Sequence, residues 1–420
     1  MIKIIISNIT NLNNKGSMAR VQGLINCINI IMPQSNIILL HRYYDKDKDS
    51  NVKELKNKYH NLTIKRHPWL NEKNNSAFTI FYSLTKLFIN VVWIILLNLL
   101  RIKRNDLYKS NIIIDLNVIE PTENVYFTMT IGAYLTLLNI WYSTLFRKPV
   151  MICSATIGPY KDKLLQHFAK YIFNKVNIIT LREELSKSYL EFLKVSKPMI
   201  YSSADLAYLM EAENSQIITV IFQQINLDEQ DRPIIGITPT AMTNPSLSTN
   251  EYIQVILDVS DYLINNFDAT IIYITNTYQD IVITEKLYKK INRNDKVKVL
   301  PSFYTASEIK GVIGKCDIFI SSRLHALIAS TSLTIPSIGL VSYSKGKFHG
   351  IVGDMMGLNN YLLDIDENFE YNKFIELLKL KIVDLWHNRN YISDNLKTNE
   401  KSVKEKVLLN GYLIKQLVNQ

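Results

Sequence analysis

Short apolar runs alternate with longer amphipathic segments along the first half of the chain. The runs are rich in isoleucine and valine, residues that favour strands. The segments between them, such as KDKLLQHFAKYIFNKV, are long enough for helices and carry apolar residues at helical spacing. Buried parallel strands joined by crossover helices produce this alternation. The runs that predict strands in this half are IKIIIS, NIILL, NIIID, PVMICSA, NIIT and PMIYS.

The same pattern starts again at DRPIIGITPT, residues 231–240. Two such sets in one chain predict an α/β protein with two Rossmann-like domains, and we expect the domains to face each other across a cleft. The expected division is an N-terminal domain over residues 1–205, a linker over 206–231, a C-terminal domain over 232–395 and a closing basic helix over 396–420.

The segment at residues 77–104 is strongly apolar and ends in cations. Lys86 interrupts it and leaves about 14 uninterrupted residues, fewer than the roughly 20 that span a bilayer. Three interpretations remain open: a helix buried in the core, a helix in a membrane interface with Trp93 on its apolar side, or a transmembrane helix. The second would place three cations at lipid headgroups, namely Arg101, Lys103 and Arg104.

Composition narrows the class of protein. Hydrophobic residues make up 47% and charged residues 20% of the chain, which is typical of a globular protein. Lysine and arginine outnumber aspartate and glutamate by 48 to 38, and this surplus favours anionic partners. The sequence has no basic block interleaved with aromatic residues, so we do not expect nucleic acid as a partner.

Cysteine spacing and the amino terminus bear on the compartment. Cys27, Cys153 and Cys316 lie far apart and form no zinc-binding or disulfide pattern. The first segment, MIKIIISNIT, lacks the pattern of a signal peptide. We therefore expect a cytoplasmic protein without a metal site, either free or held peripherally at the inner face of the membrane by residues 77–104.

The stretch SSRLHALIAS, residues 321–330, places Arg323 and His325 between an apolar run and a predicted helix. Ligands of parallel α/β sheets bind beyond the carboxyl ends of the strands, where helices begin. A desolvated guanidinium needs an anion, so Arg323 predicts either a carboxylate of the protein or an anionic ligand beside it. His325 can transfer a proton near neutral pH, and a histidine bonded to its own backbone is the structural alternative.

The loop after the next apolar run is expected at the same edge of the sheet. It carries Tyr343, Ser344 and Lys345. A second cation at this edge suits a ligand with two negative charges better than it suits an internal ion pair.

Several sequence blocks occur in a specific order along the chain. The most specific is IKGVIGKCDIFISSRLHALIASTSLTIPSIGLVSYSKGKFHGIVGDMMGL, and the others are ATIGPYKDKLLQHFAKYIFNKVNIITLREELSKSYL, SADLAYLM and NNKGSMA. Together they resemble the polysaccharide pyruvyl transferase family, whose R-[LM]-H-A core and Y-S-x-K loop both lie in the first block. That family is similar in architecture to the GT-B glycosyltransferases, which agrees with the two predicted domains.

The resemblance implies a donor, an acceptor and a set of site residues. Members of the family typically move a pyruvyl group from phosphoenolpyruvate to two hydroxyls of one sugar, forming a cyclic ketal. The expected partners are thus phosphoenolpyruvate and a glycan or lipid-linked saccharide, and no cofactor is expected. His325 and Arg323 fall in the catalytic positions. The residues implied in donor binding are Arg182, Ser322, Arg323, Ser344 and Lys345.

Asp205 matches a family aspartate near the domain junction. A helix N-cap for LAYLM is its structural alternative, because aspartate is among the preferred N-cap residues. The segment therefore leaves an interdomain role and a capping role both open.

Three functional hypotheses follow. The first is a pyruvyl transferase that acts on a cell-surface or lipid-linked glycan. The second is a sugar-nucleotide glycosyltransferase of GT-B architecture, although no acidic residue is plainly placed to bind a ribose. The third is a non-catalytic glycan-binding or assembly protein. It is motivated by the loops NITNLNNKGS and NVIEPTEN, which carry less glycine than the family pattern.

Overall fold

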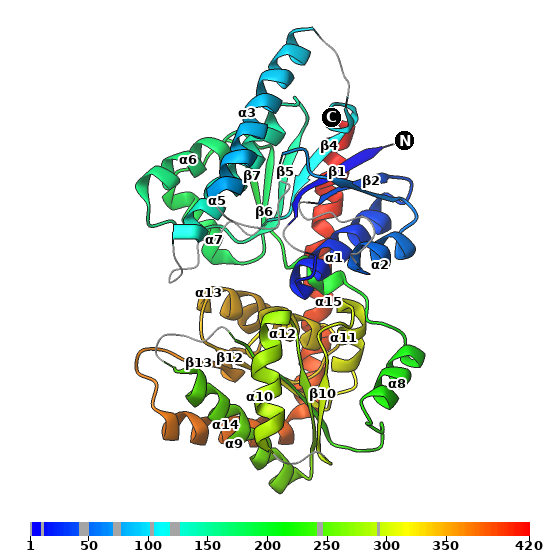
Figure 1. The fold of residues 1–420 in the computed structure, drawn as a ribbon, viewed down its shortest axis with the longest axis vertical. Helices are drawn as coiled ribbons and strands as arrows, with labels where there is room; N and C mark the ends of the chain where they lie inside the picture. Colours follow the sequence, from blue (N-terminus) through cyan, green and yellow to red (C-terminus); the bar gives the residue numbers. More distant parts are fainter. Residues whose placement is uncertain are drawn as a thin grey trace. The chain divides into compact units, whose positions relative to one another are not determined.

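The computed structural model describes residues 2–9, 12–41, 50–69, 77–100, 105–117, 127–241, 247–291 and 295–420. The chain divides into two compact units (Figure 1). The first unit contains residues 1–13, 20–209 and 405–420, and the second contains residues 14–19 and 210–404.

The first unit is built on a parallel seven-stranded sheet in the order β3-β2-β1-β4-β5-β6-β7. Its central strands are continuously buried and rich in isoleucine, such as Ile4, Ile5 and Ile6 in β1, because helices cover both faces (Figure 1). The strands are β1 (Lys3–Ile9), β2 (Asn36–His41), β3 (Leu62–Arg66), β4 (Ile112–Asp115), β5 (Val150–Ala155), β6 (Ile178–Leu181) and β7 (Met199–Ser202).

The crossover helices of the first unit follow from the strand order. The chain moves outward from β1 to β3, returns to β4 and then moves outward to β7, so its helices lie on both faces of the sheet. The helices are α1 (Lys15–Ile31), whose residues 15–19 belong to the second unit, α2 (Ser50–Lys58), α3 (Ala77–Leu99), α4 (Asp106–Lys109), α5 (Phe127–Thr144), α6 (Lys163–Phe173), α7 (Glu184–Phe192) and the 3₁₀ turn η1 (Leu206–Leu209).

The second unit contains a parallel six-stranded sheet in the order β10-β9-β8-β11-β12-β13. The strands are β8 (Ile234–Thr238), β9 (Thr270–Ile274), β10 (Val297–Leu300), β11 (Ile318–Ser321), β12 (Ser337–Val341) and β13 (Leu362–Asp364).

The helices of the second unit begin at identifiable caps. Thr305 caps the helix after β10: its side chain accepts from the N–H of Glu308, and the Glu308 carboxylate accepts from the N–H of Thr305. The helices are α8 (Ser215–Gln224), α9 (Thr249–Phe267), α10 (Ile281–Ile291), α11 (Ala306–Ile313), α12 (Leu324–Thr331), α13 (Lys345–Lys347), α14 (Tyr371–His387) and α15 (Arg389–Asn419), with the shorter turns η2 (Tyr278–Asp280), η3 (Phe348–Asp354) and η4 (Asn359–Tyr361).

These two parallel α/β sheets confirm the predicted fold class. The expected boundaries differ in two places. Residues 210–231, expected to be a linker, belong to the second unit because α8 buries Ile218, Ile221 and Phe222. The closing helix α15 begins at Arg389, and its residues from 405 onward belong to the first unit.

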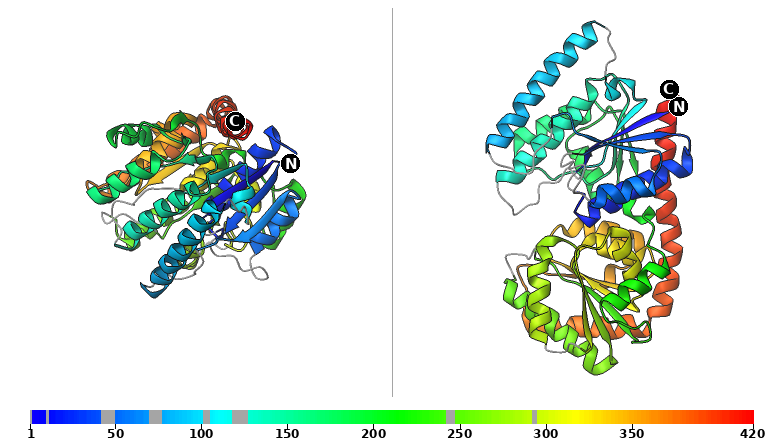
Figure 2. Two further views of the ribbon diagram at one scale, coloured as in Figure 1. Left: turned by 90° about the horizontal axis from the view of Figure 1, so that it is seen from above. Right: turned by 45° about the vertical axis from the view of Figure 1, so that its right-hand side comes forward.

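The apolar segment forms α3, which lies along the outside of the first unit (Figures 1 and 2). Within the described residues, its stretch Phe81–Leu99 is the one helix long and apolar enough to cross a membrane. Only 22% of that stretch is buried, so the interpretation as a fully buried core helix does not describe it. Residues 101–104 lie outside the described residues.

Candidate functional site

The strand order of the second sheet reverses between β8 and β11, which lie side by side. The chain builds β9 and β10 on one side of β8 and then crosses to place β11 on the other side. Such a switch point leaves a crevice beyond the carboxyl ends of the two strands, where ligands of α/β proteins bind. Thr238 and Ser321 end the two strands side by side, and the N–H of Ser322 donates to the carbonyl of Thr238 at 3.2 Å. The predicted site residues Ser322, Arg323 and His325 come immediately after β11 in the chain, at this switch point.

Arg323 leaves β11 at this edge and its side chain is only 10% exposed. Its Nη2 pairs with Oδ1 of Asp280 and lies 3.4 Å from Oγ1 of Thr277. Burial alone lowers the pKa of this guanidinium, but the Asp280 carboxylate outweighs burial and holds the pKa above its usual value. The sequence left open which anion accompanies Arg323. In the structure an internal carboxylate does.

Asp280 is fully buried and joins three loops at the carboxyl edge of the sheet. Its Oδ1 accepts from the N–H of Ala241 after β8 at 3.0 Å, in addition to binding Arg323 after β11. Its Oδ2 accepts from the N–H of Thr277 at 3.1 Å and from Oγ1 of the same residue at 2.9 Å. The carboxylate therefore fixes the position of the arginine relative to the ends of β8 and β9. Sequence analysis missed Asp280.

Ser322 is buried against the helix that follows β8. Its Oγ lies 2.7 Å from the hydroxyl of Tyr252, which also accepts from the N–H of Thr240 at 3.1 Å. Burial raises the pKa of Tyr252 to about 12, so this hydroxyl stays protonated. Because Ser322 is only 1% exposed, its side chain braces the loop and is not open to a donor in this structure.

His325 lies in the first turn of α12, and its imidazole packs against Gly16 within the second unit. A Cβ placed on Gly16 would lie 2.6 Å from Cγ and 2.8 Å from Cε1 of the ring, so any larger residue here would displace the imidazole. Asn14 fixes the segment because its Oδ1 accepts from the N–H of Gly16 at 2.9 Å. Sequence analysis missed Gly16 as a site residue, although it lies in the family block NNKGSMA.

Lys345 and Ser344 occupy the loop after β12, the neighbour of β11. Lys345 is 40% exposed, and its Nζ lies 3.5 Å from carboxylate oxygens of Asp364 and Asp366. Ser344 adopts a left-handed backbone with φ of 51°. Tyr343 is close enough to contribute to the raised pKa of Arg323. The two loops thus meet at one edge, as predicted.

The first unit holds a separate pair of charged site candidates. Arg182 and Asp205 form an ion pair in which the side chains are 1% and 0% exposed. The Nε of Arg182 also donates to Oγ1 of Thr156 at 2.7 Å. Oδ1 of Asp205 accepts from the N–H of Ala207 at 2.9 Å, so the aspartate caps η1 as well as pairing with the arginine. Arg182 is therefore paired with an internal carboxylate in this unit, as Arg323 is in the second unit.

Arg20 adds a second buried guanidinium beside this pair. Its Nη2 donates to the carbonyl of Ser154 at 3.0 Å. Burial and, to a smaller extent, the neighbouring Arg182 charge lower the pKa of Arg20 to about 10, although the Asp205 carboxylate opposes both. Sequence analysis missed this residue, although it directly follows the block NNKGSMA.

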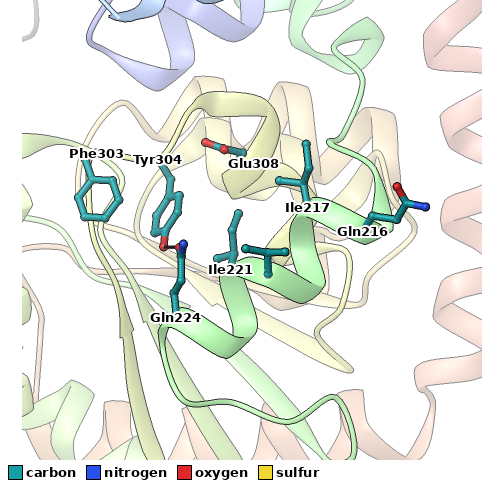
Figure 3. Close-up of a pocket in the computed structure, with 8 residues that line it drawn as sticks. Gln216, Ile217, Ile221, Gln224, Phe303, Tyr304 and Glu308 are labelled. Carbon is teal, nitrogen blue, oxygen red and sulfur yellow. Dashed lines mark hydrogen bonds between the residues drawn. The ribbon is translucent and has the colours of Figure 1, made fainter.

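A pocket of about 520 Å³ opens elsewhere on the second unit (Figure 3). One wall is α8, with Ile217 and Ile221, and the other carries Phe303 and Tyr304. Its lining residues include no cation, so it does not suit an anionic ligand. In the part of the chain that the structure describes, no cluster of three or more histidine, cysteine or acidic side chains could hold a metal ion.

Comparison with known protein sequences gives two findings. A family model described as polysaccharide pyruvyl transferase matches residues 14–344. The amylovoran biosynthesis protein AmsJ of Erwinia amylovora is 21% identical over 206 residues, which cover 47% of this chain and 50% of AmsJ. The match thus spans about half the length of that relative.

Comparison with solved structures shows the fold. The structure of Anabaena Alr3699/HepE in complex with UDP and glucose matches with a TM-score of 0.60, 12% identity and full coverage of both chains. Medicago truncatula UGT71G1 complexed with UDP-glucose matches at 0.60 with 10% identity, covering 99% of this chain and 98% of that chain. The UDP-GlcNAc 2-epimerase of Methanocaldococcus jannaschii matches at 0.56 with 14% identity, covering 90% and 91%. The chain has a GT-B-like fold.

Proposed function

Because the chain belongs to the polysaccharide pyruvyl transferase family, we propose that it transfers a pyruvyl group from phosphoenolpyruvate to a sugar of a cell-surface or lipid-linked glycan. The product is a cyclic ketal and the leaving group is phosphate. The observation that supports this most is the placement of Arg323, His325 and Lys345 at one carboxyl edge of the second sheet, beside its switch point.

The donor carries a phosphate and a carboxylate, and the edge offers a rigid cation and an exposed one. Asp280 orients Arg323, so its planar guanidinium is preorganised at the start of α12. Lys345 is partly exposed and can exchange its distant aspartate partners for a ligand oxygen. We assign donor binding to these two residues, with Ser344 shaping the Lys345 loop and Ser322 bracing the Arg323 loop.

Proton transfer is assigned to His325. Protonation of the C3 methylene of phosphoenolpyruvate places positive charge on C2, and a sugar hydroxyl attacks C2. A second hydroxyl then closes the ring as the bond from C2 to the phosphate oxygen breaks. One proton ends on the new methyl group, and the other leaves with phosphate. A histidine beside the donor can supply the first proton and accept the next from the attacking hydroxyl.

Arg182 and Asp205 take a positioning role in this proposal. Their side chains are buried in the first unit, where they join the end of β6 to η1. A pair at such depth holds backbone in place and does not touch a substrate directly. Arg20 supports the same region through the carbonyl of Ser154.

Gly16→Ala is expected to lower kcat by about 100-fold, since a methyl group at this position displaces the His325 ring and roughly 1 Å of misplacement has that effect. The assay is phosphate release from phosphoenolpyruvate in the presence of acceptor. Gly132→Ala is the matched control, because a Cβ there meets nothing within 4 Å and its helix gains stability. An unchanged kcat in Gly16→Ala would show that the position of the His325 ring does not matter for the reaction.

Lys345→Met is expected to raise KM for phosphoenolpyruvate about 10- to 100-fold, the loss expected for a hydrogen bond to a charged group. Lys315→Met provides the control, because Lys315 also pairs with a carboxylate but precedes β11, at the opposite end of the strand. Initial rates across a range of donor concentrations separate KM from kcat. Equal KM values for the two variants would show that Lys345 does not bind the donor.

Calorimetry separates the proposed function from the two alternatives. Binding of phosphoenolpyruvate, with no comparable binding of UDP-glucose, is expected. Tight binding of UDP-glucose alone would favour a sugar-nucleotide glycosyltransferase. Binding of phosphoenolpyruvate without turnover across a broad acceptor panel would favour a non-catalytic glycan-binding or assembly protein.

A further inference from the structure

Helix α3 exposes an unusually apolar surface on the first unit. Phe81, Phe88 and Leu99 are 70%, 69% and 74% exposed, and Trp93 is 50% exposed. Further large apolar side chains on the same helix are exposed, among them Ile89, Val92, Ile95 and Leu96. A contiguous apolar surface of this kind on a soluble monomer marks an interaction site.

The helix is nevertheless anchored to the unit along one stripe. Leu87, Ile94 and Leu97 are buried in the core of the first unit. The side-chain amide of Asn98 donates to the carbonyl of Leu145 at 3.1 Å, and the hydroxyl of Tyr108 donates to the carbonyl of Ile94 at 3.1 Å. Rotating the helix to hide its outer face would break these contacts. The exposed face therefore needs an external apolar partner.

Charge along this segment favours an anionic surface. The sequence has no aspartate or glutamate from residue 77 to residue 105, and the helix is followed directly by Arg101, Lys103 and Arg104. Within the helix, Lys86 lies 4.0 Å from the centre of the Tyr82 ring. Tyrosine, tryptophan and lysine around an apolar face are typical of helices at the headgroup level of a bilayer.

We propose that α3 is a membrane-docking helix that inserts its exposed apolar face into the surface of a bilayer rich in anionic phospholipid. It does not span the bilayer, since the Leu87, Ile94 and Leu97 stripe stays packed on the protein. A second copy of the chain is the alternative occupant of this face, and the lipid-free oligomeric state distinguishes it from a bilayer. This inference does not rest on the proposed function.

Flotation with vesicles tests the proposal. The full chain is expected to float with phosphatidylglycerol/phosphatidylethanolamine vesicles and much less with pure phosphatidylcholine vesicles, and high salt is expected to weaken binding. The variant Phe81→Gln/Phe88→Gln/Leu99→Gln is expected to bind at least about 100-fold more weakly, since inserting each such side chain contributes on the order of tenfold. The matched control is Leu164→Gln/Leu380→Gln/Tyr391→Gln, whose native side chains are 70%, 68% and 69% exposed.

Tryptophan fluorescence gives a second readout that does not depend on separation. Insertion is expected to shift Trp93 emission to the blue on addition of the anionic vesicles, and Trp93→Phe is expected to abolish the shift. Equal flotation of the two triple variants would overturn the proposal, as would an absence of flotation of the native chain. A lipid-free dimer that becomes monomeric in the α3 triple variant would also overturn it and would assign the face to a second copy.

Discussion

His325→Gln is expected to lower the rate of phosphate release from phosphoenolpyruvate by a factor of about 10² to 10⁴, the usual contribution of a positioned acid or base. Glutamine keeps a polar side chain of similar length but cannot carry the proton. The fold is expected to survive, because His325 is only partly buried at the start of α12. Steady-state rates at saturating donor and acceptor measure the effect.

The control for this variant is His387→Gln, which changes an exposed histidine in the last turn of α14. It is expected to leave the rate unchanged. If His325→Gln instead raises KM and preserves kcat, the histidine binds the donor and does not transfer the proton. If neither parameter changes, His325 has no part in the reaction.

Asp280→Ala is expected to destabilise the second unit by about 3–5 kcal/mol, because it leaves the Arg323 guanidinium buried without its carboxylate. It also removes the acceptor for the N–H groups of Ala241 and Thr277. Hydrogen exchange of the β8 and β11 amides reports this unit separately. The loss of protection from hydrogen exchange is expected to be largest at the carboxyl ends of these two strands.

The double variant Asp280→Leu/Arg323→Met separates structural and catalytic roles of the pair. Replacing both partners of a buried ion pair with apolar residues often restores stability. We expect stability to recover while phosphate release stays lost, because the donor no longer meets the guanidinium. Recovery of both stability and activity would show that the ion pair is only structural and that Arg323 does not bind the donor.

The sequence predicts the buried strands well and misses two strands at sheet edges. β3 (Leu62–Arg66) alternates buried and exposed residues and ends in Lys65 and Arg66, so it lacks a continuous apolar run. β13 (Leu362–Asp364) has only three residues. Both lie at the edge of their sheets, where only one side of a strand pairs. The spacing of apolar residues and the overall hydrophobicity therefore predict such edge strands poorly.

The candidate site is only half visible in the sequence. The R-x-H pattern after β11 identifies Arg323 and His325, but the arginine's partner Asp280 lies 43 residues earlier. Thr277 and Asp280 have the spacing of a capping box, which predicts a helix start and says nothing about an arginine. Gly16 becomes significant only when the fold brings the start of α1 against the imidazole. These contacts depend on strand order, which local pattern does not determine.

A sequence motif also does not predict how deeply a charged side chain is buried. Arg182 and Arg323 look alike in sequence, as single arginines that follow a strand. The Arg182 side chain is 1% exposed and pairs with Asp205, whereas the Arg323 side chain is 10% exposed and pairs with Asp280. The roles of the two arginines therefore separate only once the packing is known.

Proton NMR of the reaction in D₂O tests the proposed pyruvyl transfer most directly. The probes are phosphoenolpyruvate and methyl glycosides of glucose, galactose and mannose, together with glycans of the native host. We predict that the vinyl signals of the donor disappear, that a ketal methyl signal carrying one deuterium grows in, and that phosphate appears in equal amount. Transfer of a hexose from UDP-glucose to the same acceptors, with the vinyl signals intact, would contradict the account.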